Sequence, residues 1–213
     1  MAGPIVSDMR DDARLAFARY LERMAVYRGH GLDRPAAAQL VVDRAGPVSG
    51  PVLDVGTGTG LLALEFARRG LRVISVDVSA EEQRVAALNA EHQGVASRIG
   101  FVRADAGRLG FRDAAFGCAA MMDILHHLDD AAPIMAETVR VVRPGGTIVV
   151  AELTREGLAV VDRVHREEGR VHPVGPVTLA QATALLEAHG LVRRASARAH
   201  AHAVVVFERP RGR

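Results

Sequence analysis

Residues 52–60 read VLDVGTGTG, a short apolar run that ends in an acid and passes into three alternate glycines. A run this short and apolar, with β-branched residues, is typical of a buried strand. Gly56, Gly58 and Gly60 carry no side chains, so the backbone can turn tightly there and approach a flat ligand before a helix begins. The stretch therefore predicts a strand, a ligand-binding loop and a helix in succession.

Short apolar runs alternate with longer helical patterns from this stretch as far as residue 153. Strands are predicted at residues 52–55, 71–78, 98–105, 116–124 and 147–153, and helices at 61–70, 79–94 and 129–142, with a turn at RPGG, residues 143–146. Strands that are apolar on nearly every residue and separated by helices are typical of a parallel sheet covered on both faces. We expect a doubly wound α/β core.

The two ends of the chain extend this core. Residues 8–28 show helical spacing of apolar side chains, with Leu15, Tyr20 and Leu21 among them, and a second helix is expected from Pro35 to Gly46. A helix at 178–190 precedes two strands within 191–210, which are too close in sequence for a helical crossover and so predict an antiparallel hairpin. The expected fold is α/β, with a mostly parallel, seven-stranded, Rossmann-like sheet, a terminal antiparallel hairpin and N-terminal helices.

Composition limits the class of protein. The chain has 213 residues, 49% of them hydrophobic, yet no apolar run approaches the ~20 residues of a membrane helix, and the N-terminus lacks the pattern of a signal peptide. We therefore expect no membrane span and a cytoplasmic location. Cys118, the one cysteine, cannot form an internal disulfide and lies in an apolar run, which indicates a buried structural role.

The basic residues exclude further chemistry. All 27 are arginine and the formal net charge is +2, so the field of the whole chain is weak. Without lysine there is neither a Schiff base nor the lysine of a triphosphate-binding Walker loop. A dinucleotide loop would need its third glycine where Leu61 stands, and Asp54 would repel a pyrophosphate. That acid suits a ligand with an ammonium group.

Two further acids follow strands of the predicted sheet. Asp77 ends the second strand, where a carboxylate can accept both hydroxyls of a ribose, and Asp105 ends the third, where it can accept the amine of an adenine. Each acid alone could instead cap a helix, as aspartate often does. Three acids and three glycines together favour a cationic adenosine ligand such as S-adenosylmethionine (SAM).

With VLDVGTGTG, VISVDVS, FVRADAGRLGF, MMDILHHLDD and VVRPGGTIVVAEL, the chain resembles class I SAM-dependent methyltransferases, in particular the small-molecule subgroup that includes the ubiquinone and menaquinone biosynthesis type. The resemblance covers about residues 50–153. It implies one domain with an N-terminal helical cap (1–48), a SAM-binding core (50–153), a substrate-side segment (154–177) and a closing helix and hairpin (178–213). It also implies a SAM site, with S-adenosylhomocysteine (SAH) as the product of the reaction. Asp54, Gly56, Gly58 and Gly60 are expected along the methionine part, Asp77 at the ribose, and Val78, Asp105 and Ala106 around the adenine, and Thr57 and Met122 are expected to bind the cofactor as well.

The predicted fourth strand leads to the reacting centre. It lacks the Asn/Asp-Pro-Pro-Tyr sequence of enzymes that methylate adenine or glutamine nitrogen, so those acceptors are not expected. His126 and His127 follow it closely. Either histidine could remove a proton from an acceptor, because histidine titrates near neutral pH, or it could simply pack.

Residues 155–177 contain the least expected pattern. If this segment is helical, Asp162 and His165 share a face, and His172 lies just beyond its end. The alternatives are an acid–base or metal cluster and an exposed charged helix. The second is favoured, and no metal is expected, because neither His-x-x-x-His nor cysteine spacing is present. His165 is a third candidate catalytic residue, and Tyr20, Tyr27, His165 and His172 are predicted on the substrate side.

The function expected from these residues is methyl transfer to a small-molecule acceptor, and the eight aromatic residues favour a small or aliphatic one. An RNA or protein methyltransferase is the first alternative, although the low net charge makes a nucleic-acid partner unlikely. A non-catalytic SAM-binding protein is the second. We expect a monomer or a homodimer.

Overall fold

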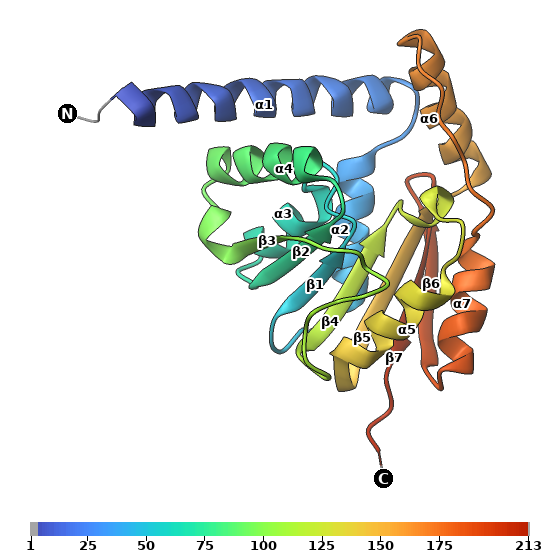
Figure 1. Ribbon diagram of the computed structural model, residues 1–213. Coiled ribbons are helices and arrows are strands. Elements are labelled where there is room, and N and C mark those ends of the chain that lie inside the picture. Colours follow the sequence, from blue (N-terminus) through green and yellow to red (C-terminus); the bar gives the residue numbers. More distant parts are fainter. Residues whose placement is uncertain (1–3, 213) are drawn as a thin grey trace.

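The computed structural model describes residues 4–212 and shows one seven-stranded sheet flanked by helices (Figure 1). The strand order is β3-β2-β1-β4-β5-β7-β6. The first five strands pair in parallel, and β7 runs antiparallel to both of its neighbours. The strands are β1 (Val52–Val55), β2 (Val73–Asp77), β3 (Ile99–Arg103), β4 (Phe116–Met122), β5 (Val142–Leu153), β6 (Val192–Ala199) and β7 (His202–Glu208). The predicted doubly wound sheet and closing hairpin are confirmed.

Helices cover both faces of the sheet. They are α1 (Pro4–Gly29), α2 (Arg34–Ala45), α3 (Leu61–Arg68), α4 (Ala80–His92), α5 (Ala132–Val141), α6 (Arg155–Glu167) and α7 (Leu179–Ala188), with short 3-10 turns η1 (Ala96–Arg98) and η2 (Leu125–His127). Val52, Cys118 and Val149 point to the face of α2 and α3, whereas Leu53, Ala119 and Val150 point to the face of α5 and α7. This alternation produces two buried apolar layers.

Two further expectations concern the buried position of Cys118 and the lack of a membrane-spanning helix. Cys118 is fully buried, and burial raises the pKa of its thiol to about 12, so the thiol stays protonated and acts as a small apolar side chain. In the part of the chain that the structure describes, none of the helices has the length and hydropathy needed to cross a membrane.

Two local predictions were wrong. Residues 143–146 do not form a separate turn before the strand. They lie within β5, where the N–H of Gly145 donates to the carbonyl of Arg209 and the N–H of Arg209 donates to the carbonyl of Gly146. The C-terminal segment thus continues the pairing through the glycines. Leu15 and Leu21 do not belong to the buried face of α1, since each is about half exposed, while Tyr20 and Tyr27 are buried.

The sheet reverses its order between β1 and β4, where Val55 lies beside Met121. In an open α/β sheet, ligands bind at the carboxyl ends of the strands at such a reversal. Figure 1 shows α1 and α6 on this side of the sheet, above the strand ends.

Candidate active site

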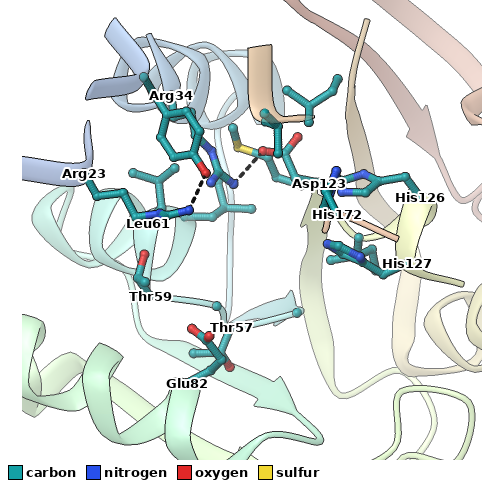
Figure 2. A pocket seen from close by; sticks show the side chains of 18 of the residues that line it. Arg23, Arg34, Thr57, Thr59, Leu61, Glu82, Asp123, His126, His127 and His172 are labelled. Carbon is teal, nitrogen blue, oxygen red and sulfur yellow. Dashed lines mark hydrogen bonds and ion pairs between the residues drawn. The ribbon is translucent and has the colours of Figure 1, made fainter. Parts of the chain in front are cut away.

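A cavity of about 520 Å³ lies at this point of reversal. Its wall comes from the loop after β1, the ends of β2, β4 and β5, the helices α1, α2 and α6, and the segment after α6. Figure 2 shows the loop residues Thr57 and Thr59 on one side of the cavity and three histidines on another.

The loop after β1 has a backbone that favours glycine. Gly56, Gly58 and Gly60 all have positive φ, at 86°, 47° and 90°. A Cβ atom on Gly56 would lie 2.2 Å from Cγ2 of Ile124, so the segment after β4 closes against the loop there. Gly60 occupies the N-cap of α3 in the left-handed conformation. The predicted strand, loop and helix are confirmed, and the loop backbone faces the cavity.

Asp77 anchors the loop to the end of β2. Its carboxylate accepts hydrogen bonds from the backbone N–H groups of Gly58, at 3.1 Å, and Ser79, at 2.9 Å. Glu82 on α4 also lines the cavity, and burial, followed by the negative charge of Asp77, raises the pKa of its carboxyl group. The remaining acceptor sites on these two acids suit a ligand with adjacent hydroxyl groups.

Asp54 lies beneath the loop rather than on the cavity wall. Its Oδ2 accepts from the Ser75 hydroxyl at 2.7 Å, and that hydroxyl lies 2.7 Å from the hydroxyl of Thr57. Burial raises the pKa of the Asp54 carboxyl to about 7, despite the hydrogen bond from Ser75. Its Oδ1 is buried and has no hydrogen-bond partner among the described residues. A cation above the loop is therefore the group that this oxygen would attract.

The residues expected around an adenine lie outside the cavity. Val78 is 64% exposed, and Asp105 is also exposed, accepting the backbone N–H of Gly107 at 2.8 Å. Neither they nor Ala106 line the cavity. Their contact with an adenine stays a prediction.

A buried ion pair that the sequence analysis did not assign connects the cavity to the sheet. Asp123, directly after β4, accepts from Arg34 at 2.8 Å and lies 3.0 Å from Nε2 of His202 on β7. Burial alone would raise the pKa of Asp123, but the charges of Arg34 and His202 lower it to about 2. Burial alone would likewise lower the pKa of His202, and Asp123 raises it instead. The non-glycine φ of 59° at Asp123 aims its side chain into this network.

Tyr27 lies between two arginines on the helical side of the cavity. Arg23 and Arg34 approach its ring at 5.2 and 5.5 Å from the centroid, within the range of a cation–π contact. Its hydroxyl accepts from Arg23 at 2.9 Å, and Arg23 also pairs with Glu168 at 2.7 Å. The pair with Glu168 fastens α1 to the segment after α6.

Histidines gather at the other end of the cavity. The rings of His126 and His127 are 4.0 Å apart, and His172 lies 5.1 Å from the first and 5.4 Å from the second. His165 on α6 lies 4.9 Å from His172. Burial, followed by the neighbouring histidines, lowers the pKa of His127 to about 4, and burial also lowers the pKa of His165 and His172. These three imidazoles are therefore neutral at pH 7.

Glu152, near the end of β5, orients His126. Its Oε1 lies 2.6 Å from Nδ1 of His126, and its Oε2 accepts from the backbone N–H groups of Leu125 and His126. The His126 ring is thus held by one nitrogen, and Nε2 is left for another partner.

Ten of the residues predicted from the sequence line the cavity, and six do not. Those that line it are Gly56, Thr57, Gly58, Asp77, Met122, Tyr27, His126, His127, His165 and His172; those that do not are Asp54, Gly60, Val78, Asp105, Ala106 and Tyr20. Tyr20 is instead buried in the apolar core and stacks on Phe17. No role was predicted from the sequence for Arg23, Arg34, Glu82, Asp123 or Glu152, all of which take part in the contacts described above.

Comparisons with known proteins agree with this geometry. Residues 53–150 match a family model described as a methyltransferase domain. The chain is 30% identical over 122 residues to ubiquinone biosynthesis O-methyltransferase of Aeromonas salmonicida, covering 57% of this chain and 51% of that protein. It is 37% identical over 115 residues to demethylmenaquinone methyltransferase of Thermobifida fusca, covering 53% and 48%. The solved structure of the [4+2]-cyclase SpnF has the same fold, with a TM-score of 0.68, 23% identity and coverage of 84% and 81%.

Residues 53–150 are therefore similar to a methyltransferase domain, and this part of the chain is similar to methyltransferases of quinone biosynthesis. The chain spans about half the length of the curated relatives that it matches. The shared part includes the glycine loop and the strands that carry Asp77 and Met122.

Proposed function

We propose that this protein transfers a methyl group from SAM to a small-molecule acceptor, leaving SAH. One observation carries the proposal: a single cavity joins the glycine loop and Asp77 at one end to a group of histidines at the other. The first end suits the adenosine and methionine parts of the cofactor. The second end lies where an acceptor would meet the methyl group.

The residues present fit the charges of SAM. Nε of Arg34 is buried without a hydrogen-bond partner among the described residues, so a carboxylate in the cavity would satisfy a free donor. Asp77 has acceptor capacity left for ribose hydroxyls. The bare backbone of Gly56 and Gly58 allows a methionine chain to pass closely.

The cofactor, when bound, supplies a methyl group on a positively charged sulfur, which leaves as a neutral thioether when the acceptor attacks the methyl carbon in line. The protein then has two tasks. α1 and the segment after α6, joined through Arg23 and Glu168, exclude water from the cavity. The walls hold the acceptor against the methyl group, and such orientation can contribute ~7–11 kcal/mol. His165 also lines the cavity, burial lowers its pKa so that it is neutral at pH 7, and it can take up the proton that the acceptor loses.

The nature of the acceptor is inferred from the wall. Tyr27 is the one tyrosine or phenylalanine among the described residues that line the cavity, and half of the other lining residues are charged or histidine. The names of the relatives support a small molecule as well. We infer a small, polar acceptor with a hydroxyl or amine. The predicted cytoplasmic location and the predicted monomer or homodimer belong to this proposal.

Calorimetry with SAM and SAH tests the cofactor assignment. Asp77→Ala should weaken binding about 10- to 100-fold, because hydrogen bonds to a charged group contribute ~1.5–3 kcal/mol. Asp113→Ala is the matched control, since Asp113 lies on the surface and pairs only with Arg140 among the described residues. Equal binding by both variants, or none by the unaltered protein, would contradict the proposal.

A second experiment separates catalysis from binding. The fold also occurs in a protein named a [4+2]-cyclase, so the fold alone does not establish methyl transfer. Metabolite extracts are incubated with the protein and with SAM labelled in its methyl group. Labelled products that depend on the protein identify the acceptor. Tight SAM binding with no labelled product would instead favour the non-catalytic alternative.

A further inference from the structure

The histidine end of the cavity brings together side chains from distant parts of the chain. His126 and His127 lie on the turn η2, and His172 lies in the segment after α6. One ring nitrogen from each of these three histidines lies within 4.8 Å of the other two. We refer to these residues as the three-histidine cluster.

The cluster is held in place from outside. Glu152 binds Nδ1 of His126 at 2.6 Å, which leaves Nε2 to face another partner. A carboxylate that fixes one nitrogen of a histidine is the usual outer partner of a metal-bound imidazole. On the other segment, Gly175 donates to the carbonyl of His126 at 2.7 Å, and a Cβ there would lie 2.5 Å from the carbonyl of Leu128. The two segments are therefore joined closely.

The free nitrogens point to a missing partner. His172 is 8% exposed, and its Nδ1 is buried with no hydrogen-bond partner among the described residues. Nδ1 of His165, beside it, is in the same condition. A buried polar nitrogen without a partner has a free-energy cost of ~1–3 kcal/mol. Simple packing of the histidines would leave that cost in place, whereas a cation bound at Nδ1 of His172 would remove it there.

We propose that His126, His127 and His172 bind one divalent transition-metal ion, such as Zn²⁺, Co²⁺ or Fe²⁺. Three imidazole ligands with an open fourth position are characteristic of catalytic zinc sites. Three nitrogens bound at ~2.0–2.1 Å to one ion lie ~3.4 Å from one another. Side-chain rotations that move the ring nitrogens by about 1 Å would therefore bring them to the distances that a bound ion requires. His127, the exposed member, has the freedom to make that movement. The absence of His-x-x-x-His spacing does not matter here, because two separate segments supply the ligands.

The open position of this ion would face the cavity. An oxygen or nitrogen of the acceptor could occupy it and lose its proton more readily, because a metal ion lowers the pKa of a bound group. This assignment of a role rests on the proposed methyl transfer. The metal site itself does not, since it can be measured without SAM or acceptor.

The test is a titration of the full, tag-free, metal-depleted protein with Co²⁺, followed by visible absorption. We expect bands typical of four- or five-coordinate cobalt that saturate at one ion per chain. His127→Ala and His172→Ala should weaken binding more than ~100-fold, beyond the ~10–100-fold expected for Glu152→Gln, which alters an outer partner. His189→Ala is the matched control, an exposed histidine outside the cluster, and should bind as the unaltered protein does.

His127→Ala changes an exposed side chain, so the fold should persist, which circular dichroism checks. No cobalt bands in the unaltered protein, or equal binding by the His127→Ala and His189→Ala proteins, would overturn the metal site. SAM calorimetry on the same metal-depleted sample keeps the two proposals apart. Binding of SAM without cobalt contradicts only the metal site, and binding of cobalt without SAM contradicts only the methyl-transfer function.

Discussion

The glycine-loop end of the cavity and its histidine end differ in how the chain builds them. The first comes largely from residues 52–82, a strand, a loop, a helix, a second strand and the start of the next helix in direct succession. The second combines η2, the end of β5, α6 and the segment after it, which lie far apart in sequence. A local motif carries its ligand chemistry with it, whereas an assembled cluster exists only once the chain is folded.

The largest expected effect concerns the ion pair between the two ends. Asp123→Ala leaves Arg34 and the buried His202 without their counter-charge, and removal of one partner of a buried pair costs ~3–5 kcal/mol. Chemical denaturation should show that loss in the free energy of unfolding. Asp113→Ala, which breaks a surface pair with Arg140, should cost less than ~1 kcal/mol. Equal losses of unfolding free energy in the Asp123→Ala and Asp113→Ala proteins would contradict the claim that the buried ion pair holds the two ends of the cavity together.

The same ion pair sets a dependence on pH. The pKa of Asp123 is lowered to about 2 in the folded protein, below the ordinary value of 3.8. Its contribution to stability is therefore complete above pH 3.8 and is lost as the pH falls toward 2. Unfolding curves of the unaltered protein and of Asp123→Ala should converge over that range. Curves that stay parallel would contradict the lowered pKa.

The next effect distinguishes two glycines of one loop. Gly56→Ala places a residue with a side chain at positive φ and brings its Cβ against Ile124, so we expect a loss of ~2–4 kcal/mol. Gly58→Ala also has positive φ, but no atom lies within 4 Å of its Cβ, and a loss of ~1–2 kcal/mol is expected. Thermal unfolding monitors both. The reverse order would show that the loop does not close against Ile124.

Part of this site could be predicted from the sequence. The roles of Gly56, Gly58 and Asp77 could be predicted from neighbouring residues alone, because a strand followed by a glycine-rich sequence forms such a loop through local contacts. The adenine contacts could not be derived in the same way, because the sequence indicates where a strand ends but not where its side chains point. Val78, Asp105 and Ala106 lie outside the cavity, and their contact with an adenine stays a prediction. Arg34 could not be predicted either, because only the docking of α2 brings it to Asp123.

The histidine cluster and the turn at residues 143–146 show the same limit. His172 lies 45 residues beyond His127, so no short spacing indicates that they meet. The sequence accordingly predicted no metal. Gly145 and Gly146 are turn residues by local preference, yet pairing with Arg209 keeps them in β5. In both cases, contacts between distant segments outweigh the local pattern.

The smallest effect concerns Asp54. It lies beneath the loop, so its attraction for the ammonium group of SAM acts through the loop backbone, and Asp54→Asn should weaken SAM binding about tenfold, or ~1.4 kcal/mol. Because burial raises the pKa of this carboxyl to about 7, its negative charge forms as the pH rises through 7. Calorimetry should therefore show stronger SAM binding at pH 8 than at pH 6 in the unaltered protein and not in the variant. An unchanged affinity in the variant would remove Asp54 from the cofactor site.

A crystal structure of the protein with SAH tests most directly whether the two ends form one active site. We predict that the ribose lies at Asp77, that the carboxylate of SAH meets Arg34, and that its sulfur faces the three-histidine cluster across the cavity. SAH bound outside the cavity, or with its sulfur turned away from His126, His127 and His172, would contradict the account.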